Sequence, residues 1–98
     1  MKVEYATKRV EKKFTKYLQG TEFSDKIKQR IMELKAAPNL SVIDKMKFPE
    51  LHKLRGEKKG LMSIKVKKNW KIIFRARDSF DNYAEVKALE LIDFEDYH

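Results

Sequence analysis

An alternating pattern in the second half of the chain constrains the fold most. Over residues 62–67 and again over 70–75, apolar side chains alternate with side chains that are mostly polar. Such alternation is typical of a strand with one buried face, and Lys68-Asn69 between the two runs makes a plausible tight turn. The sequence therefore predicts an antiparallel hairpin. Because alternate residues of a strand point to opposite faces, another part of the chain must cover one face of this hairpin.

The two faces of the predicted hairpin differ in charge. We expect the covered face to carry Met62, Ile64, Val66, Trp70, Ile72 and Phe74. The opposite face then carries Ser63, Lys65, Lys67, Lys71 and Arg75. Polar side chains are the ordinary content of an uncovered sheet face. Four of these five residues are cations and none is a carboxylate, so we predict a basic binding surface on an open side of the sheet.

The first half of the chain has helical periodicity instead. Residues 1–6 alternate as a short strand, and Thr7 can cap a helix that runs to about Gln19. A second amphipathic helix starts near Ser24, and Pro38 ends it. Two short helices with little between them should form an antiparallel hairpin that covers one face of the sheet.

Three weaker segments complete the predicted elements. A turn of helix is expected around residues 42–46, and a second turn over 78–82. A long strand then covers residues 83–94. The alternation of apolar and polar residues in this strand shifts by one position between Ala88 and Leu89, which predicts a β-bulge there.

Length and composition bound the class of protein. The 98 residues suffice for one two-layer core. We expect a single α+β domain over residues 1–98, with an N-terminal strand and two-helix hairpin packed on one face of a small antiparallel sheet. The formal charge of +8 favours nucleic acid or another anionic partner, although a merely solvated surface is the alternative.

The sequence also indicates what to exclude. It has no cysteine, so disulfides and thiolate metal sites are excluded and a reducing cytoplasm is compatible. No apolar stretch approaches the roughly 20 residues of a membrane span, and Lys2 and Glu4 interrupt any signal-peptide core. We therefore expect a cytoplasmic protein with no membrane partner.

The chain has two histidines, the one residue type whose unperturbed pKa lies near neutral pH. His52 lies in the basic run 51–56, and His98 closes the sequence Asp96-Tyr97-His98. Taken alone, His52 is an ordinary surface histidine and the last residues are a frayed tail. Taken together, they are candidates for acid–base work on a negatively charged substrate.

Four short blocks in order carry a family resemblance. They are Leu51-His52-Lys53-Leu54-Arg55-Gly56, Gly60-Leu61-Met62-Ser63-Ile64, Asn69-Trp70-Lys71-Ile72-Ile73-Phe74 and Asp96-Tyr97-His98. In this order they resemble the HigB toxins of the RelE/ParE superfamily. The resemblance implies a type II toxin that enters the ribosomal 30S A site and cleaves mRNA there. It also implies neutralisation by a helix-turn-helix antitoxin, HigA, and contact with operator DNA only through that antitoxin.

The resemblance also implies an active site. It places His52, Asp96, Tyr97 and His98 there, with Arg55 and Lys71 on phosphate, and the open sheet face adds Lys65 and Arg75 as further phosphate contacts. RNA cleavage of this kind needs a base, an acid and cations, and no metal or cofactor. The histidines would transfer protons, Asp96 would orient or charge a histidine, and Tyr97 would bond the phosphate or stack on a base.

Two departures and two rival functions stay open. Lys71 stands where the family more often has arginine, which replaces a bidentate phosphate grip by a point charge. The segment 78–91 is longer than usual. One rival is a ParE-like toxin that inhibits DNA gyrase and cleaves nothing; the other is a basic nucleic-acid-binding module without chemistry. His52 with the last three residues favours the nuclease, because neither rival needs that set.

Overall fold

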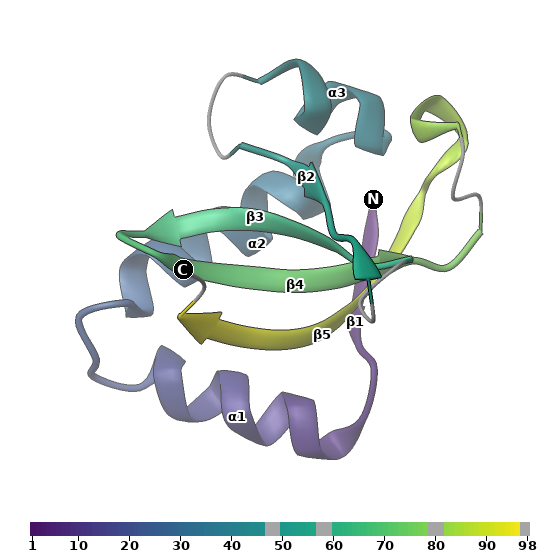
Figure 1. Ribbon diagram of the computed structural model, residues 1–98. Coiled ribbons are helices and arrows are strands. Elements are labelled where there is room, and N and C mark those ends of the chain that lie inside the picture. Colours follow the sequence, from purple (N-terminus) through teal and green to yellow (C-terminus); the bar gives the residue numbers. More distant parts are fainter. Residues whose placement is uncertain (47–49, 57–59, 79–81, 97–98) are drawn as a thin grey trace.

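The computed structural model describes residues 1–46, 50–56, 60–78 and 82–96 (Figure 1). Its helical elements are α1 (Lys8–Leu18), α2 (Ser24–Ala36), α3 (Leu40–Lys45) and the 3-10 turn η2 (Tyr83–Glu85). Its strands are β1 (Lys2–Tyr5), β2 (His52–Lys53), β3 (Met62–Lys67), β4 (Trp70–Ala76) and β5 (Ala88–Asp96). They form one sheet of order β1-β5-β4-β3-β2. Only β1, which runs parallel to β5, departs from antiparallel pairing, so the predicted α+β class is confirmed.

The predicted helices form where their capping residues allow. The Thr7 hydroxyl accepts a hydrogen bond from the Val10 amide at 3.2 Å and so caps α1. The Asn39 side chain caps α3 in the same way, at 3.3 Å from the Val42 amide. Gly20, with a φ of 73°, follows α1 in the left-handed conformation that favours glycine. The helix α2 ends at Ala36, two residues before Pro38, as predicted.

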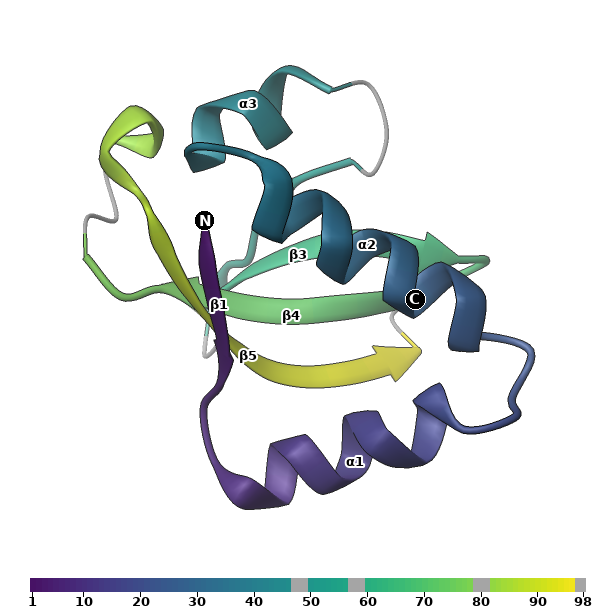
Figure 2. The same cartoon turned by 180° about the vertical axis from the view of Figure 1, so that it is seen from behind.

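The helices α1 and α2 lie on one side of the sheet. In Figure 1 no helix crosses in front of β3, β4 and β5, whereas Figure 2 shows α2 crossing in front of β3 and β4. The central contact is the Phe94 ring of β5, which has no exposed surface. It stacks on Trp70 at 4.9 Å between centroids, and Tyr17 of α1 meets it edge-on at 5.0 Å. Phe94 therefore joins α1 to the middle of the sheet.

The last predicted strand begins later than expected. Residues 83–85 form η2 rather than a strand, because the Asn82 side chain accepts from the Ala84 amide at 3.1 Å and bends the chain. Val86, fully buried, then accepts a hydrogen bond from the Leu40 amide at 3.1 Å, which fastens this segment to α3. The predicted strand over 83–94 was therefore wrong at its start, and β5 begins at Ala88.

The predicted bulge exists but lies elsewhere. Between β4 and β5, Ile73 pairs with Asp93 and Phe74 with Leu91, so Ile92 is the extra residue. The prediction of a bulge at Ala88 was wrong. Buried residues alternate regularly from Leu89 to Leu91, and this alternation shifts only between Leu91 and Phe94.

A second bulge changes the face of one lysine. Lys65 pairs with Lys71 and Lys67 with Trp70, which leaves Val66 unpaired. Lys67 consequently stands opposite an aromatic of the helix side, and its ammonium lies 3.6 Å from Glu22 in the connection between α1 and α2. The prediction that Lys67 shares the open face was therefore wrong. Within the described residues, no helix is both long and apolar enough to cross a bilayer.

The ring cluster gives the first prediction. Phe94→Ala should destabilise the protein by about 3–5 kcal/mol, because it empties a fully enclosed space between α1 and the sheet. Urea unfolding followed by circular dichroism measures the change. Met32→Ala on α2, where the side chain is 68% exposed, is the control and should shift stability by less than about 0.5 kcal/mol. Equal effects of the two substitutions would contradict the packing described.

Candidate functional site on the open face of the sheet

The open face is organised in rows of directly paired residues, because paired side chains on neighbouring strands point to the same side. The middle row joins His52 of β2, Ser63 of β3 and Ile73 of β4. A second row joins Lys65, Lys71 and Glu95. A third row joins Arg75 and Glu90. The rows place the predicted histidine and the predicted cations on one surface.

His52 is exposed at the edge of this face. A hollow of about 520 Å³ beside it is lined by residues 51–56 and by Gly60. His52 and Arg55, both predicted site residues, therefore line the same hollow. Ser63, directly opposite His52, is completely buried, and its hydroxyl has no hydrogen-bond partner among the described residues. A buried hydroxyl of this kind calls for a functional or structural partner.

Lys65 and Lys71 face each other across β3 and β4. Like charges directly opposite one another destabilise a sheet unless an anion lies near them. Glu50 lies 3.8 Å from the Lys65 ammonium, and Glu95 stands opposite Lys71. Two ammonium groups on directly paired residues can also bind one phosphate between them.

Carboxylates of β5 divide the predicted basic surface. Arg75 donates from Nε to the Glu90 carboxylate at 2.9 Å, with the Arg75 side chain about half exposed. Asp93, opposite Ile73, pairs with Lys13 of α1 at 2.5 Å. The expectation of a face without carboxylates therefore holds for β3 and β4 alone. It fails for the whole sheet, because the sequence pattern could not show that β5 lies next to β4.

Asp96 lies away from His52 among the described residues. It pairs with Trp70 and follows Phe94 by two positions, so strand alternation turns it toward the helix side. Two strands, β4 and β3, separate β5 from β2. The predicted residues Tyr97 and His98 lie outside the described residues.

Arg30 is a contributor that the sequence analysis missed. Only about 4% of its side chain is exposed, and Nε donates to the Lys65 carbonyl at 2.9 Å. Its guanidinium also pairs with Glu33 at 2.8 Å. This contact fixes the backbone of Lys65 next to the bulge at Val66. The signal was present, since Arg30 falls between Ile27 and Leu34 on the apolar stripe of α2, where a cation needs a buried partner.

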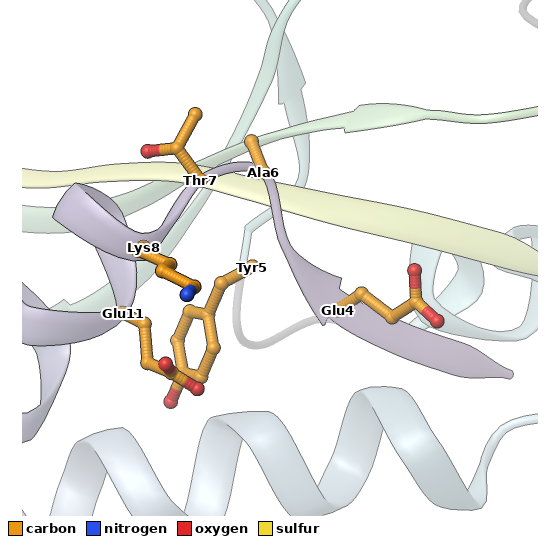
Figure 3. A pocket seen from close by; sticks show the side chains of 6 residues that line it. All are labelled: Glu4, Tyr5, Ala6, Thr7, Lys8 and Glu11. Carbon is orange, nitrogen blue, oxygen red and sulfur yellow. The ribbon is translucent and has the colours of Figure 1, made fainter.

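A second hollow lies where β1 meets α1 and holds none of the predicted site residues. Glu4, Tyr5, Ala6, Thr7, Lys8 and Glu11 line it (Figure 3). Burial raises the pKa of the Tyr5 phenol, and the charge of Glu11 raises it further. The pKa of Glu4 is lowered by a hydrogen bond from Lys2 and by the charge of Lys2. The charge of Arg77 lowers this pKa to a smaller extent. Two carboxylates and the ammonium group of Lys8 share the wall of this hollow.

The described residues offer no metal centre, since nowhere among them do three His, Asp or Glu side chains gather closely enough to hold an ion. Among the described residues, the open face carries His52, several cations and the buried hydroxyl of Ser63. This set can bind a phosphate and move a proton.

Comparison with known proteins gives matches over most of the chain. A family described as the RelE-like toxin of type II toxin-antitoxin system HigB matches residues 4–93, which stops short of the last five residues. "Endoribonuclease HigB" of Proteus vulgaris is 30% identical over 74 residues, covering 76% of this chain and 71% of that protein.

Solved structures share the fold at lower identity. The "YoeB/ParE toxin from Agrobacterium tumefaciens" superposes with a TM-score of 0.67 at 17% identity, over all of both chains. A chain of the "YoeB-YefM complex from Staphylococcus aureus" gives 0.67 at 11% identity, over all of this chain and 97% of that one. These likenesses support the architecture of a strand, two helices and a sheet with one open face.

The buried arginine gives the second prediction. Arg30→Gln should destabilise the protein by about 2–4 kcal/mol, since it removes a charge-assisted bond to Lys65 and leaves Glu33 without this partner. Chemical denaturation measures the change in the free energy of unfolding. Lys28→Gln removes the same charge from an exposed position of the same helix and should cost less than about 0.5 kcal/mol. A small effect at Arg30 would mean that the contact with β3 is dispensable.

Proposed function

The chain belongs to the RelE-like HigB toxins of type II toxin-antitoxin systems, and from this premise we propose that it is a ribosome-dependent endoribonuclease. It cleaves mRNA by acid–base catalysis without a metal ion. The observation that carries the proposal is the position of His52 on the same open face as the opposed Lys65 and Lys71. The 30% identity to a protein named "Endoribonuclease HigB" supports the choice of substrate.

The reaction follows from the chemistry of RNA. A base takes the proton of the ribose 2′-hydroxyl, and the 2′-oxygen attacks the neighbouring phosphorus. The bond from phosphorus to the 5′-oxygen breaks, and an acid gives that oxygen a proton. The products are a cyclic phosphate and a free 5′-hydroxyl. Each positioned acid or base contributes typically ~10²–10⁴-fold to the rate.

Within this proposal His52 and His98 are the proton-transfer groups. Arg55 is the proposed phosphate contact, which its position on the wall of the same hollow as His52 supports. Lys65 and Lys71 stabilise the extra negative charge of the phosphorane, as point charges rather than bidentate groups.

The other predicted residues have secondary roles. Asp96, two strands away from His52, orients His98 rather than His52. Tyr97 bonds the phosphate or stacks on a base. Arg75 reaches the RNA only by releasing Glu90, so it contributes less than Lys65.

The proposed partners follow from the family. A small helix-turn-helix antitoxin of the HigA kind neutralises the toxin, and operator DNA is met through that antitoxin. The structures of YoeB–YefM assemblies, which share this fold, support an antitoxin partner. The ribosomal 30S A site holds the message while the toxin acts, which places the protein in the cytoplasm.

The third prediction tests catalysis. His52→Ala, and separately deletion of His98, should each lower single-turnover mRNA cleavage on programmed ribosomes by ~10²-fold or more. Lys26→Gln, an exposed position of α2, is the control and should cleave at the wild-type rate. The melting curve of His52→Ala should move little, because this side chain is exposed, and a melting curve of the His98-deleted protein checks that it is folded.

The same assay separates the rival mechanisms. Folded variants that cleave normally without His52 or His98 would refute the catalytic assignment. Inhibition of gyrase supercoiling without cleavage would favour the ParE-like alternative. Strict dependence of metal-stripped protein on added zinc or manganese would contradict metal-free catalysis.

The fourth prediction concerns the antitoxin. Expression of the protein alone should arrest growth, and co-expression of a small helix-turn-helix protein encoded beside it should restore growth and co-purify with it. The His52→Ala variant is the control, since it should fail to arrest growth and still bind the antitoxin. If expression of the wild type is harmless and no neighbouring helix-turn-helix protein binds it, the assignment as a toxin is contradicted.

A further inference from the structure

The helix α1 carries a row of charges that the proposed active site does not use. Five of its eleven residues are Lys or Arg, and Glu11 is its one carboxylate. Lys8, Lys12 and Lys16 follow one another at intervals of four residues, and all three are exposed. Residues four apart are neighbours on one side of a helix. These three lysines are called the α1 stripe below.

The α1 stripe forms no ion pair in the part of the chain that the structure describes, although Lys8 shares a hollow with Glu4 and Glu11. No hydrogen bond or ion pair joins any of its three ammonium groups to another group there. Lys13 on the flank of α1, by contrast, pairs with Asp93. Like charges at this spacing destabilise a helix by a few tenths of a kcal/mol per pair. The stripe thus weakens α1 slightly and gives no internal contact in return, which is the pattern expected of a surface that binds an external anion.

The α1 stripe and the open face are separate surfaces. The opposite side of α1 is the apolar one, where Phe14 is fully buried and lies 6.2 Å from Phe94 between ring centroids. The stripe is therefore turned away from the sheet. Both ribbon views place α1 alongside β5 at one edge of the molecule, away from β2 and His52 (Figures 1 and 2). One partner can contact α1 while another molecule occupies the open face.

The chemistry of the stripe favours RNA over protein. A protein interface needs buried apolar or aromatic anchors. The large hydrophobic residues exposed among the described positions are Met32 and Val42, and neither belongs to α1. A straight row of lysines, spaced about 5–6 Å apart, resembles the spacing of successive phosphates on a nucleic acid strand. Lysine is also a strong phosphate ligand that reads charge and not sequence.

We propose that the α1 stripe binds the phosphate backbone of structured RNA, outside the active site and without contacts to bases. The identity of this RNA rests on the proposed function: it is ribosomal RNA, and the stripe holds the protein on the ribosome while the message lies on the open face. The cations of the open face have carboxylate neighbours such as Glu50 and Glu90, whereas the lysines of the α1 stripe form no ion pair among the described residues.

Binding to ribosomes without message tests the proposal, because it is read with no cleavage step. In the test variant Lys8, Lys12 and Lys16 all become Gln. In the control Lys26, Lys28 and Lys35, which are exposed on α2, become Gln, so the net charge falls equally. Glutamine keeps a helix propensity close to that of lysine, so both variants should fold. The slope of log affinity against log salt should fall by about 2 for the test variant, at roughly 0.7–0.9 for each phosphate that the protein no longer neutralises.

Four outcomes can be distinguished. A slope and affinity that change only in the α1 variant support the proposal, and the same difference on a synthetic RNA hairpin identifies phosphate as the ligand. Equal changes in both variants overturn it, since net charge alone then explains binding. Unchanged ribosome binding together with weakened antitoxin binding also overturns it and assigns the stripe to an acidic protein surface. A wild type that never cleaves but still shows the α1 effect would reject the proposed nuclease and keep this inference.

Discussion

The contact of Phe94 with the rings around it is the interaction on which the rest of the structure depends. Phe94 meets Phe14 and Tyr17 of α1, Phe23 before α2 and Trp70 of β4, with centroids 4.9–6.2 Å apart. These rings fasten both helices to one side of the sheet and so decide which side stays open. The open side then receives every second residue of β3 and β4, and with them His52, Lys65 and Lys71. The proposed chemistry is a consequence of which face the aromatic residues occupy.

Two bulges then set the distribution of charge. The bulge at Ile92 lets Phe94 reach the core after Leu91 and leaves Glu95 opposite Lys71 on the open face, whereas Asp93 pairs with Lys13 of α1. The bulge at Val66 moves Lys67 to the helix side, where it meets Glu22. The open face therefore carries both cations and carboxylates, whereas Lys8, Lys12 and Lys16 of α1 form no ion pair within the described structure. Lys8, Lys12 and Lys16 therefore add positive charge to a surface away from the candidate active site.

Much of the candidate site could be predicted because its signals are local. His52 and Arg55 lie three residues apart, and the hollow beside them is built largely from that run. The opposition of Lys65 and Lys71 could not be predicted from the turn at Lys68-Asn69, because a regular register would pair Lys71 with Val66 and the bulge at Val66 shifts the pairing to Lys65. Arg30 could not be assigned, because its partner is a backbone carbonyl 35 positions away along the chain. The ion pair between Arg75 and Glu90 could not be predicted for the same reason, since Glu90 belongs to a different strand.

The sequence by itself determined the elements that depend on neighbours along the chain. The caps at Thr7 and Asn39, the stop at Gly20 and the alternation over 62–67 specify α1, α3 and β3 through hydrogen bonds and periodicities of a few residues. Only the tertiary structure decided that β5 lies between β1 and β4, that residues 83–85 turn rather than extend, and which carboxylate meets which cation. These features depend on strand register between distant segments, and register is fixed by packing a shared apolar face rather than by local propensity.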